Sequence, residues 1–452
     1  MSSLSAALAS IHMHSLVTTI DFDEVTKGLS KEDQSYILKS FIGLEKDFKK
    51  DYKENKAMKM TVHLHELRHF HDLLMSTYGV LQFRIQLHKY FNYFGFLFLG
   101  ILKQKVPIKI PLSSDDLLNL DISEDKKFAK NFIRINNEQD ERRNALNYIG
   151  DNRLFSTLSI LENIAHSIQM GCIENHSTFN NSFEIQKKFA NLMKLDKNIQ
   201  KYIAPMNIIL NSAKNIIPKN TASNTFISNT GDLVGILFSN LLTYLPGETA
   251  SFPLESFMEK SKNIQKYIVF KDNFIQIESP DEINDYNKIY ENNQEYLKNY
   301  YAWIQKQIPL THHEYMVPIL SMLDAVIKAR EFIHENFSIK QLLDGNEYLK
   351  IFHQLPKNPV VFVSQKGIKE NKLFSEHYKV LLGMERSGEN YAHFFTPKKN
   401  DYHCFNKDWE NFYKWYFPLE FILSGKENFD HPILLAFIKS LIEIGVEVEL
   451  KK

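Results

Sequence analysis

The chain has 452 residues, of which 44% are hydrophobic and 13% aromatic, which is enough for large cores and for two or three domains of ordinary size. Lysine plus arginine and aspartate plus glutamate both number 54, so the sequence has no net positive charge with which to hold nucleic acid. Its two cysteines are too few for a disulfide framework or a four-cysteine zinc site, which favours a reducing compartment.

The start of the chain and its apolar stretches predict a cytoplasmic protein that does not enter a membrane. Residues 1–9 lack the basic start and the long apolar core of a secretory signal. The most apolar stretch, Tyr90 to Leu102, is shorter than the roughly 20 residues that cross a bilayer, so we expect a buried helix there. Neither nucleic acid nor a membrane is an expected partner, and nothing in the composition specifies an oligomeric state.

Helical periodicity dominates the first part of the chain, where apolar residues recur at spacings of three and four. The sequence predicts helices from Lys31 to Lys50, from Val62 to Thr77 with an end near Gly79, from Leu81 to Leu102, within 113–150, and from Leu154 to Gln169. The third of these is apolar on nearly every side, as expected of a central helix that others cover.

The second part of the chain is also mostly helical, with a little β structure. The sequence predicts helices at 183–193, 197–217, 232–244, 286–307, 312–337, 408–417 and 431–444. A short hairpin is expected at 267–277 and one buried strand from Val360 to Val363. The predicted fold class is therefore mainly α with minor β.

A polar stretch at 218–224 is the best candidate for a domain boundary. It predicts a first domain at 1–217, which contains the patterns discussed next. The second domain, 218–452, is expected to be mostly helical and to recognise a substrate or regulate activity.

The most informative segment of the sequence is His65-Glu66-Leu67-Arg68-His69, an HExxH pattern. Residues four apart lie one above the other on a helix, so His65 and His69 can offer two imidazoles to one metal ion. Glu66 lies at the adjoining edge of the same face, near enough to take a proton from a water molecule on the metal. Zinc in a hydrolytic site generally has three protein ligands, so a third ligand must come from elsewhere.

Three neighbours of this pattern have other expected roles. His63 and His71 point away from the face of the two candidate ligands, so we interpret them as ordinary surface or core histidines. Asp72 lies on that face, where it is either an exposed charge or an acceptor for an imidazole N–H.

Glu162 and His166 lie four apart on the helix predicted from Leu154 to Gln169, on a line beside its apolar stripe. A carboxylate that borders a core costs free energy unless it has a partner. A metal ion is one such partner, and a lysine or arginine is another.

A helix with HExxH followed by a later helix with a glutamate resembles the gluzincin branch of the zincin metallopeptidases, over about residues 58–172. The resemblance implies a zincin-like helical catalytic core with an additional helical C-terminal region, and Zn2+ held by His65, His69 and Glu162. It also implies that Glu66 is the general base in the hydrolysis of peptide bonds.

The chain departs from that branch in one respect, and one residue of the expected mechanism is marked by no pattern. The interval from His69 to Glu162 is longer than is typical of that branch, and an inserted helical segment at about 105–150 would explain it. No pattern marks the residue that stabilises the oxyanion, for which His166 is the candidate. In build, the chain is similar to bacterial intracellular metalloproteases of the toxin or phage-exclusion type, so a protein or peptide inside the cell is the expected substrate.

Two other functions stay open at this point. His71-Asp72 matches the paired residues of an HD-type metal-dependent phosphohydrolase, with His12 or His14 as the upstream histidine outside the cluster. The second alternative is a non-enzymatic helical interaction module, in which the histidines bind no metal.

Overall fold

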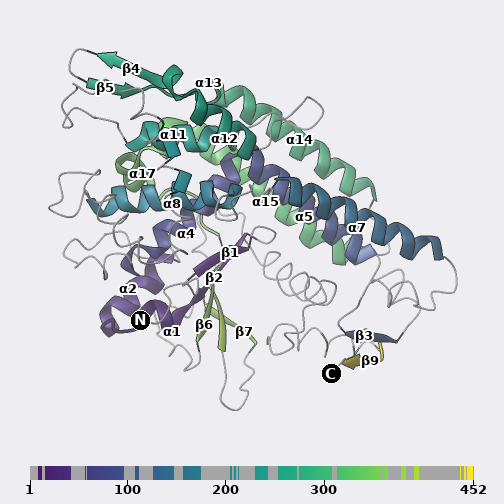
Figure 1. Ribbon diagram of the computed structural model, residues 1–452. Coiled ribbons are helices and arrows are strands. Elements are labelled where there is room, and N and C mark those ends of the chain that lie inside the picture. The colour runs from purple at the N-terminus through teal and green to yellow at the C-terminus, as the bar shows by residue number, and fades with distance from the viewer. Residues whose placement is uncertain are drawn as a thin grey trace.

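The computed structural model in Figure 1 describes residues 9–12, 16–41, 56, 59–95, 107–110, 126–146, 156–174, 204–205, 208–209, 212, 230–242, 253–271, 274–307, 313–358, 360–364, 378–382, 391–395, 438, 442–443 and 445–450. These residues are mainly helical, which confirms the predicted fold class. The helices predicted at 183–193 and 408–417 lie outside the described residues, and those at 197–217 and 431–444 lie mostly outside them.

The helices have the following bounds: α1 (Phe22–Thr26), α2 (Lys31–Phe41), α4 (Val62–Met75), α5 (Thr77–Gly95), α7 (Lys126–Leu146), α8 (Thr157–Glu174), α11 (Thr230–Ser239), α12 (Pro253–Lys262), η3 (Ile264–Tyr267), α13 (Asp281–Asn284), α14 (Tyr286–Gln307), α15 (His313–Asn336), α16 (Ile339–Leu343) and α17 (Gly345–Ile351). The long helices predicted at 286–307 and 312–337 are confirmed as α14 and α15. None of the helices within the described residues is long and apolar enough to cross a membrane.

A five-stranded sheet combines strands that are more than 300 positions apart in the sequence. It has the order β1 (Ala9–His12), β2 (Val17–Asp21), β6 (Val360–Ser364), β8 (Tyr391–Phe395) and β7 (Tyr378–Leu382), and only β2 and β6 pair in parallel. The sequence predicted β6 from its continuous apolar run and missed the other four strands. Their runs are short and partly polar, as in Thr18-Thr19, so that pairing rather than local pattern determines them.

Two smaller sheets complete the β structure. The predicted hairpin is confirmed as β4 (Ile268–Lys271) and β5 (Phe274–Ile277), which pair antiparallel. The strand β3 (Ile108–Ile110) pairs in parallel with β9 (Val448–Leu450), a pairing that the sequence did not predict.

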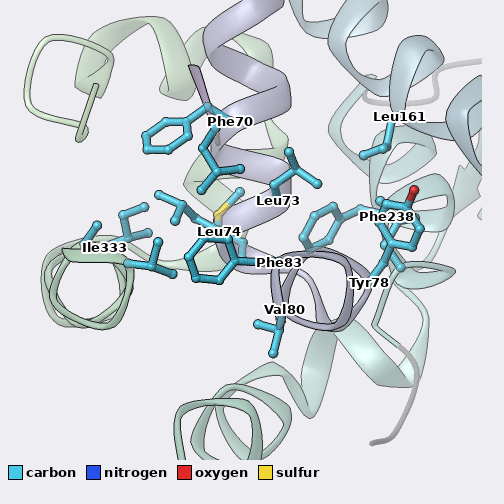
Figure 2. Packing of buried hydrophobic residues seen from close by; sticks show 14 of the residues in the cluster. Phe70, Leu73, Leu74, Tyr78, Val80, Phe83, Leu161, Phe238 and Ile333 are labelled. Carbon is cyan, nitrogen blue, oxygen red and sulfur yellow. The ribbon is translucent and has the colours of Figure 1, made fainter. Parts of the chain in front are cut away.

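The main hydrophobic core surrounds α4. Phe70 and Leu74 of this helix belong to a buried cluster that also contains Leu161 of α8, Phe238 of α11 and Ile333 of α15 (Figure 2). This core thus includes side chains from both sides of the boundary predicted at 217/218. The boundary itself stays a prediction, because the residues around it lie outside the described ones.

The junction between α4 and α5 differs from its prediction. The helix ends at Met75, Ser76 adopts an extended conformation, and α5 begins at once with Thr77. The Ser76 Oγ accepts the Gly79 N–H at 3.0 Å, which caps the new helix. Gly79 therefore lies in the first turn of α5 and does not end α4. A Cβ at position 79 would overlap the backbone of Leu73, so glycine is required there by the close crossing of the two helices.

Candidate metal centre

Helices α4 and α8 pack against each other and run in opposite directions. Gln169, late in α8, donates a hydrogen bond of 2.9 Å to the Thr61 Oγ1 just before α4 begins. Glu162, two turns earlier in α8, lies beside His65 and His69. The antiparallel packing therefore brings the glutamate of one helix to the two histidines of the other.

Three side-chain atoms converge at this point. The Nε2 atoms of His65 and His69 lie 3.1 Å apart, and the Glu162 Oε2 lies 3.1 Å from the first and 3.4 Å from the second. The two imidazole rings stand perpendicular, with centroids 4.7 Å apart. Within the part of the chain that the structure describes, no other three His, Cys, Asp or Glu residues converge in this way.

These distances fit a zinc ion. With zinc bonds of about 2.0–2.1 Å, two ligand atoms at a tetrahedral angle lie about 3.3 Å apart, close to all three observed separations. Two imidazole nitrogens and a carboxylate oxygen are also ligands that zinc prefers. The three side chains are 12%, 9% and 26% exposed in the order His65, His69 and Glu162, so the site is open to solvent on the side of the glutamate.

Glu162 is held as a carboxylate in this arrangement. Burial by itself raises the pKa of Glu162, but the charges and hydrogen bonds of His69 and His65 outweigh burial and hold the pKa well below its usual value. The two imidazoles are thus the partners that a carboxylate at the border of a core needs.

Glu66 is the buried carboxyl group next to this cluster. The residue is only 5% exposed, and its Oε2 has no hydrogen-bond partner among the described residues. Burial, opposed by His65 and aided by Glu162, raises the pKa of Glu66 to about 7. A buried carboxyl oxygen without a partner is costly, so it indicates a group kept for another role.

His166 lies one turn after Glu162 and is also buried. Burial, with a further contribution from His65, lowers the pKa of His166 to about 3, so that this imidazole is neutral near pH 7. The structure thus places all five predicted site residues in one region, whereas their chemical roles stay predictions.

The other histidines of the segment lie in the core, as interpreted. His63 packs edge-on against the aromatic rings of Tyr36, Phe41 and Phe352. In His71 the Nδ1 lies 2.8 Å from the Tyr348 hydroxyl and the Nε2 lies 2.7 Å from a backbone carbonyl oxygen. Both ring nitrogens of His71 therefore already have hydrogen-bond partners.

Asp72 is fully buried and forms an ion pair with Arg68, whose Nη2 lies 2.7 Å from its Oδ1. Arg68 also donates to the Leu342 carbonyl of α16, and its guanidinium lies 5.1 Å from the centre of the Tyr348 ring in α17. Among the described contacts, neither carboxylate oxygen of Asp72 accepts a hydrogen bond from a ligand imidazole. The ion pair lies within α4, and the other two contacts of Arg68 join this helix to α16 and α17.

Sequence reasoning missed Arg68 and Tyr348 as supports of the site. Arg68 lies within the HExxH pattern, but its partners in α16 and α17 are more than 270 positions away, and no local pattern connects them with it. The available signal was the spacing of Arg68 and Asp72, which are four apart on one helix face and so favour an ion pair.

Lys357 is a second buried charge behind α4. Its Nζ donates a hydrogen bond of 2.9 Å to the Phe352 carbonyl and lies 4.0 Å from the centre of the Phe352 ring. Burial lowers the pKa of Lys357 from 10.5 to about 7. His63 and His71 lie near it, and burial lowers the pKa of each to about 3, so both are neutral above pH 6.

The pH dependence of stability should reveal this lysine. Between pH 7 and pH 10.5 the unfolded chain holds a proton that the folded chain releases, so the free energy of unfolding rises with pH by up to about 1.4 kcal/mol per pH unit. Lys357→Met has no amine to lose a proton on folding, so its free energy of unfolding lacks this rise with pH. It also avoids the cost of burying the amine, so it should be more stable than wild type near pH 7. Urea denaturation should show the stability advantage of Lys357→Met over wild type shrinking from pH 7 to pH 9, while exposed Lys350→Met stays parallel to wild type. If the stability difference between Lys357→Met and wild type does not change with pH, the Lys357 amine does not release its proton on folding, which would contradict its lowered pKa.

No protein-family model, curated protein or solved structure with which the chain was compared matches it.

Proposed function

We propose that the chain is a zinc-dependent peptidase that hydrolyses peptide bonds of an intracellular protein substrate in the cytoplasm. The observation that carries the proposal is the convergence of His65, His69 and Glu162 beside the buried carboxyl group of Glu66. Two imidazoles and a carboxylate on paired helices, next to a carboxyl oxygen without a partner, are what hydrolysis with a general base requires.

Each side chain has a role in this proposal. His65, His69 and Glu162 hold the zinc ion, which when bound supplies Lewis acidity that activates water and polarises a carbonyl. Glu66 receives the proton of the attacking water and passes it to the leaving amine. His166, one turn beyond Glu162, is the proposed donor of an N–H to the oxyanion of the substrate.

The contacts favour this function over the HD-type phosphohydrolase. In that alternative His71 and Asp72 would bind metal, yet both ring nitrogens of His71 have other partners and Asp72 is paired with Arg68. A non-enzymatic helical module, in turn, does not require three potential metal-ligand atoms to converge beside a buried carboxyl group.

Removal of the metal tests the proposal. The purified chain is expected to bind one zinc ion and to cleave a denatured protein such as casein, with cleavage lost after dialysis against a chelator and restored by stoichiometric zinc. Cleavage products are measured by mass spectrometry. Cleavage that survives complete removal of zinc, or a purified chain that binds no zinc, would contradict it.

A further inference from the structure

The two helices of the candidate metal centre reach solvent at very few side chains. On α4 every side chain is buried except that of His65. On α8 every side chain from Thr157 to Gln169 is buried except those of Leu158 and Glu162. Within Val62–Met75 and Thr157–Gln169, the side chains that reach solvent are therefore those of His65, Glu162 and Leu158, and we call these three residues the mouth of the cluster.

Leu158 is the apolar member of this mouth. It is 44% exposed and lies one turn before Glu162 on the same side of α8. Single exposed apolar residues are common on protein surfaces, so exposure by itself identifies no site. Here, however, the leucine is the most exposed side chain among the described residues of α8, and it borders the candidate ligand that is most open to solvent.

A peptide whose carbonyl group approaches the cluster must pass this mouth. An extended peptide places neighbouring side chains about 7 Å apart on each face, and one helical turn advances 5.4 Å. A side chain next to the scissile bond therefore falls within reach of Leu158. Contact between two apolar side chains removes both from water and favours binding, whereas a charged side chain would lose hydration at the same position.

We propose that Leu158 is a specificity-determining residue, which selects substrates with a large apolar side chain next to the scissile bond. The proposal rests on the proposed function, because it assigns the substrate class of the same site. It adds that binding distinguishes apolar from small side chains through one surface residue that is neither a proposed zinc ligand nor the proposed general base.

Calorimetry with two small zinc-directed probes tests this selection without any need for catalysis. The zinc-loaded chain is titrated with N-acetyl-leucine hydroxamate and with N-acetyl-glycine hydroxamate, which differ only in the side chain. We expect wild type to bind the leucine probe about tenfold more tightly than the glycine probe. Leu158→Ser should reduce this ratio to about twofold or less, with the zinc content and the melting temperature unchanged.

The chain offers a matched control in Met258 of α12, which is 43% exposed and lies outside the mouth. Met258→Ser should keep the tenfold ratio. Wild type that binds both probes equally, or Leu158→Ser with the ratio of wild type, would overturn the selection by Leu158 and leave the zinc site standing. A chain that binds neither zinc nor either probe would overturn the proposed function, and the selection with it.

Discussion

Replacement of Glu66 by glutamine is expected to lower kcat/KM for peptide hydrolysis about 100- to 10,000-fold and to leave one zinc ion bound. Glutamine has nearly the shape of glutamate, so the packing around position 66 is preserved, but its amide cannot take a proton from water. The three candidate ligands belong to other residues and are untouched. Catalysis and metal binding should therefore separate in this variant.

Stability gives the same variant a second readout. Burial raises the pKa of Glu66 to about 7, so a charged carboxylate at this position is unfavourable. A neutral amide avoids that cost, and we expect the free energy of unfolding of Glu66→Gln at pH 8 to equal or exceed that of wild type. Glu295→Gln, on the exposed face of α14, is the control and should change neither activity nor stability. An unchanged rate in Glu66→Gln would remove Glu66 from the chemistry, and lost zinc would place it among the ligands.

Replacement of Arg68 by methionine is expected to lower the free energy of unfolding by about 3–5 kcal/mol. The substitution leaves the carboxylate of Asp72 fully buried without its partner, which is costly because a charge then lies in a medium of low polarity. It also removes the hydrogen bond to α16 and the contact with the Tyr348 ring. Denaturation in urea measures the loss.

The double variant Arg68→Met/Asp72→Leu should recover most of that stability, because it removes both charges together. Arg330→Met is the matched control. Arg330 is also fully buried, donates to the Leu74 carbonyl of α4 and lies over the ring of Tyr290, but has no carboxylate in ion-pair distance among the described residues. A loss in Arg68→Met no larger than in Arg330→Met would contradict the importance of the ion pair.

The parts of the site that lie close in sequence could be predicted from it. The spacing of His65 and His69 determines that they share a helix face, and helical periodicity places Glu162 at the border of an apolar stripe. The structure brings these three residues together despite the long interval between His69 and Glu162, because α4 and α8 pack antiparallel. Their function as zinc ligands stays a prediction.

Features that depend on distant contacts could not be predicted. The contacts of Arg68 with α16 and α17 join segments that are more than 270 positions apart in the sequence. The glycine at position 79 was interpreted as the end of a helix, since a sequence cannot distinguish that role from a close helix crossing. The strand β2 pairs with β6 across more than 300 residues, and its short, partly polar run gives no sign of a partner.

The central claim is that His65, His69 and Glu162 bind one zinc ion together, and elemental analysis of the purified chain tests it most directly. Wild type, His65→Ala and Glu162→Ala are compared after equal exposure to zinc, with circular dichroism to show that each variant is folded. We expect one zinc ion per chain in wild type and less than a tenth of that in each folded variant. A folded Glu162→Ala that retains a full equivalent of zinc would contradict the claim.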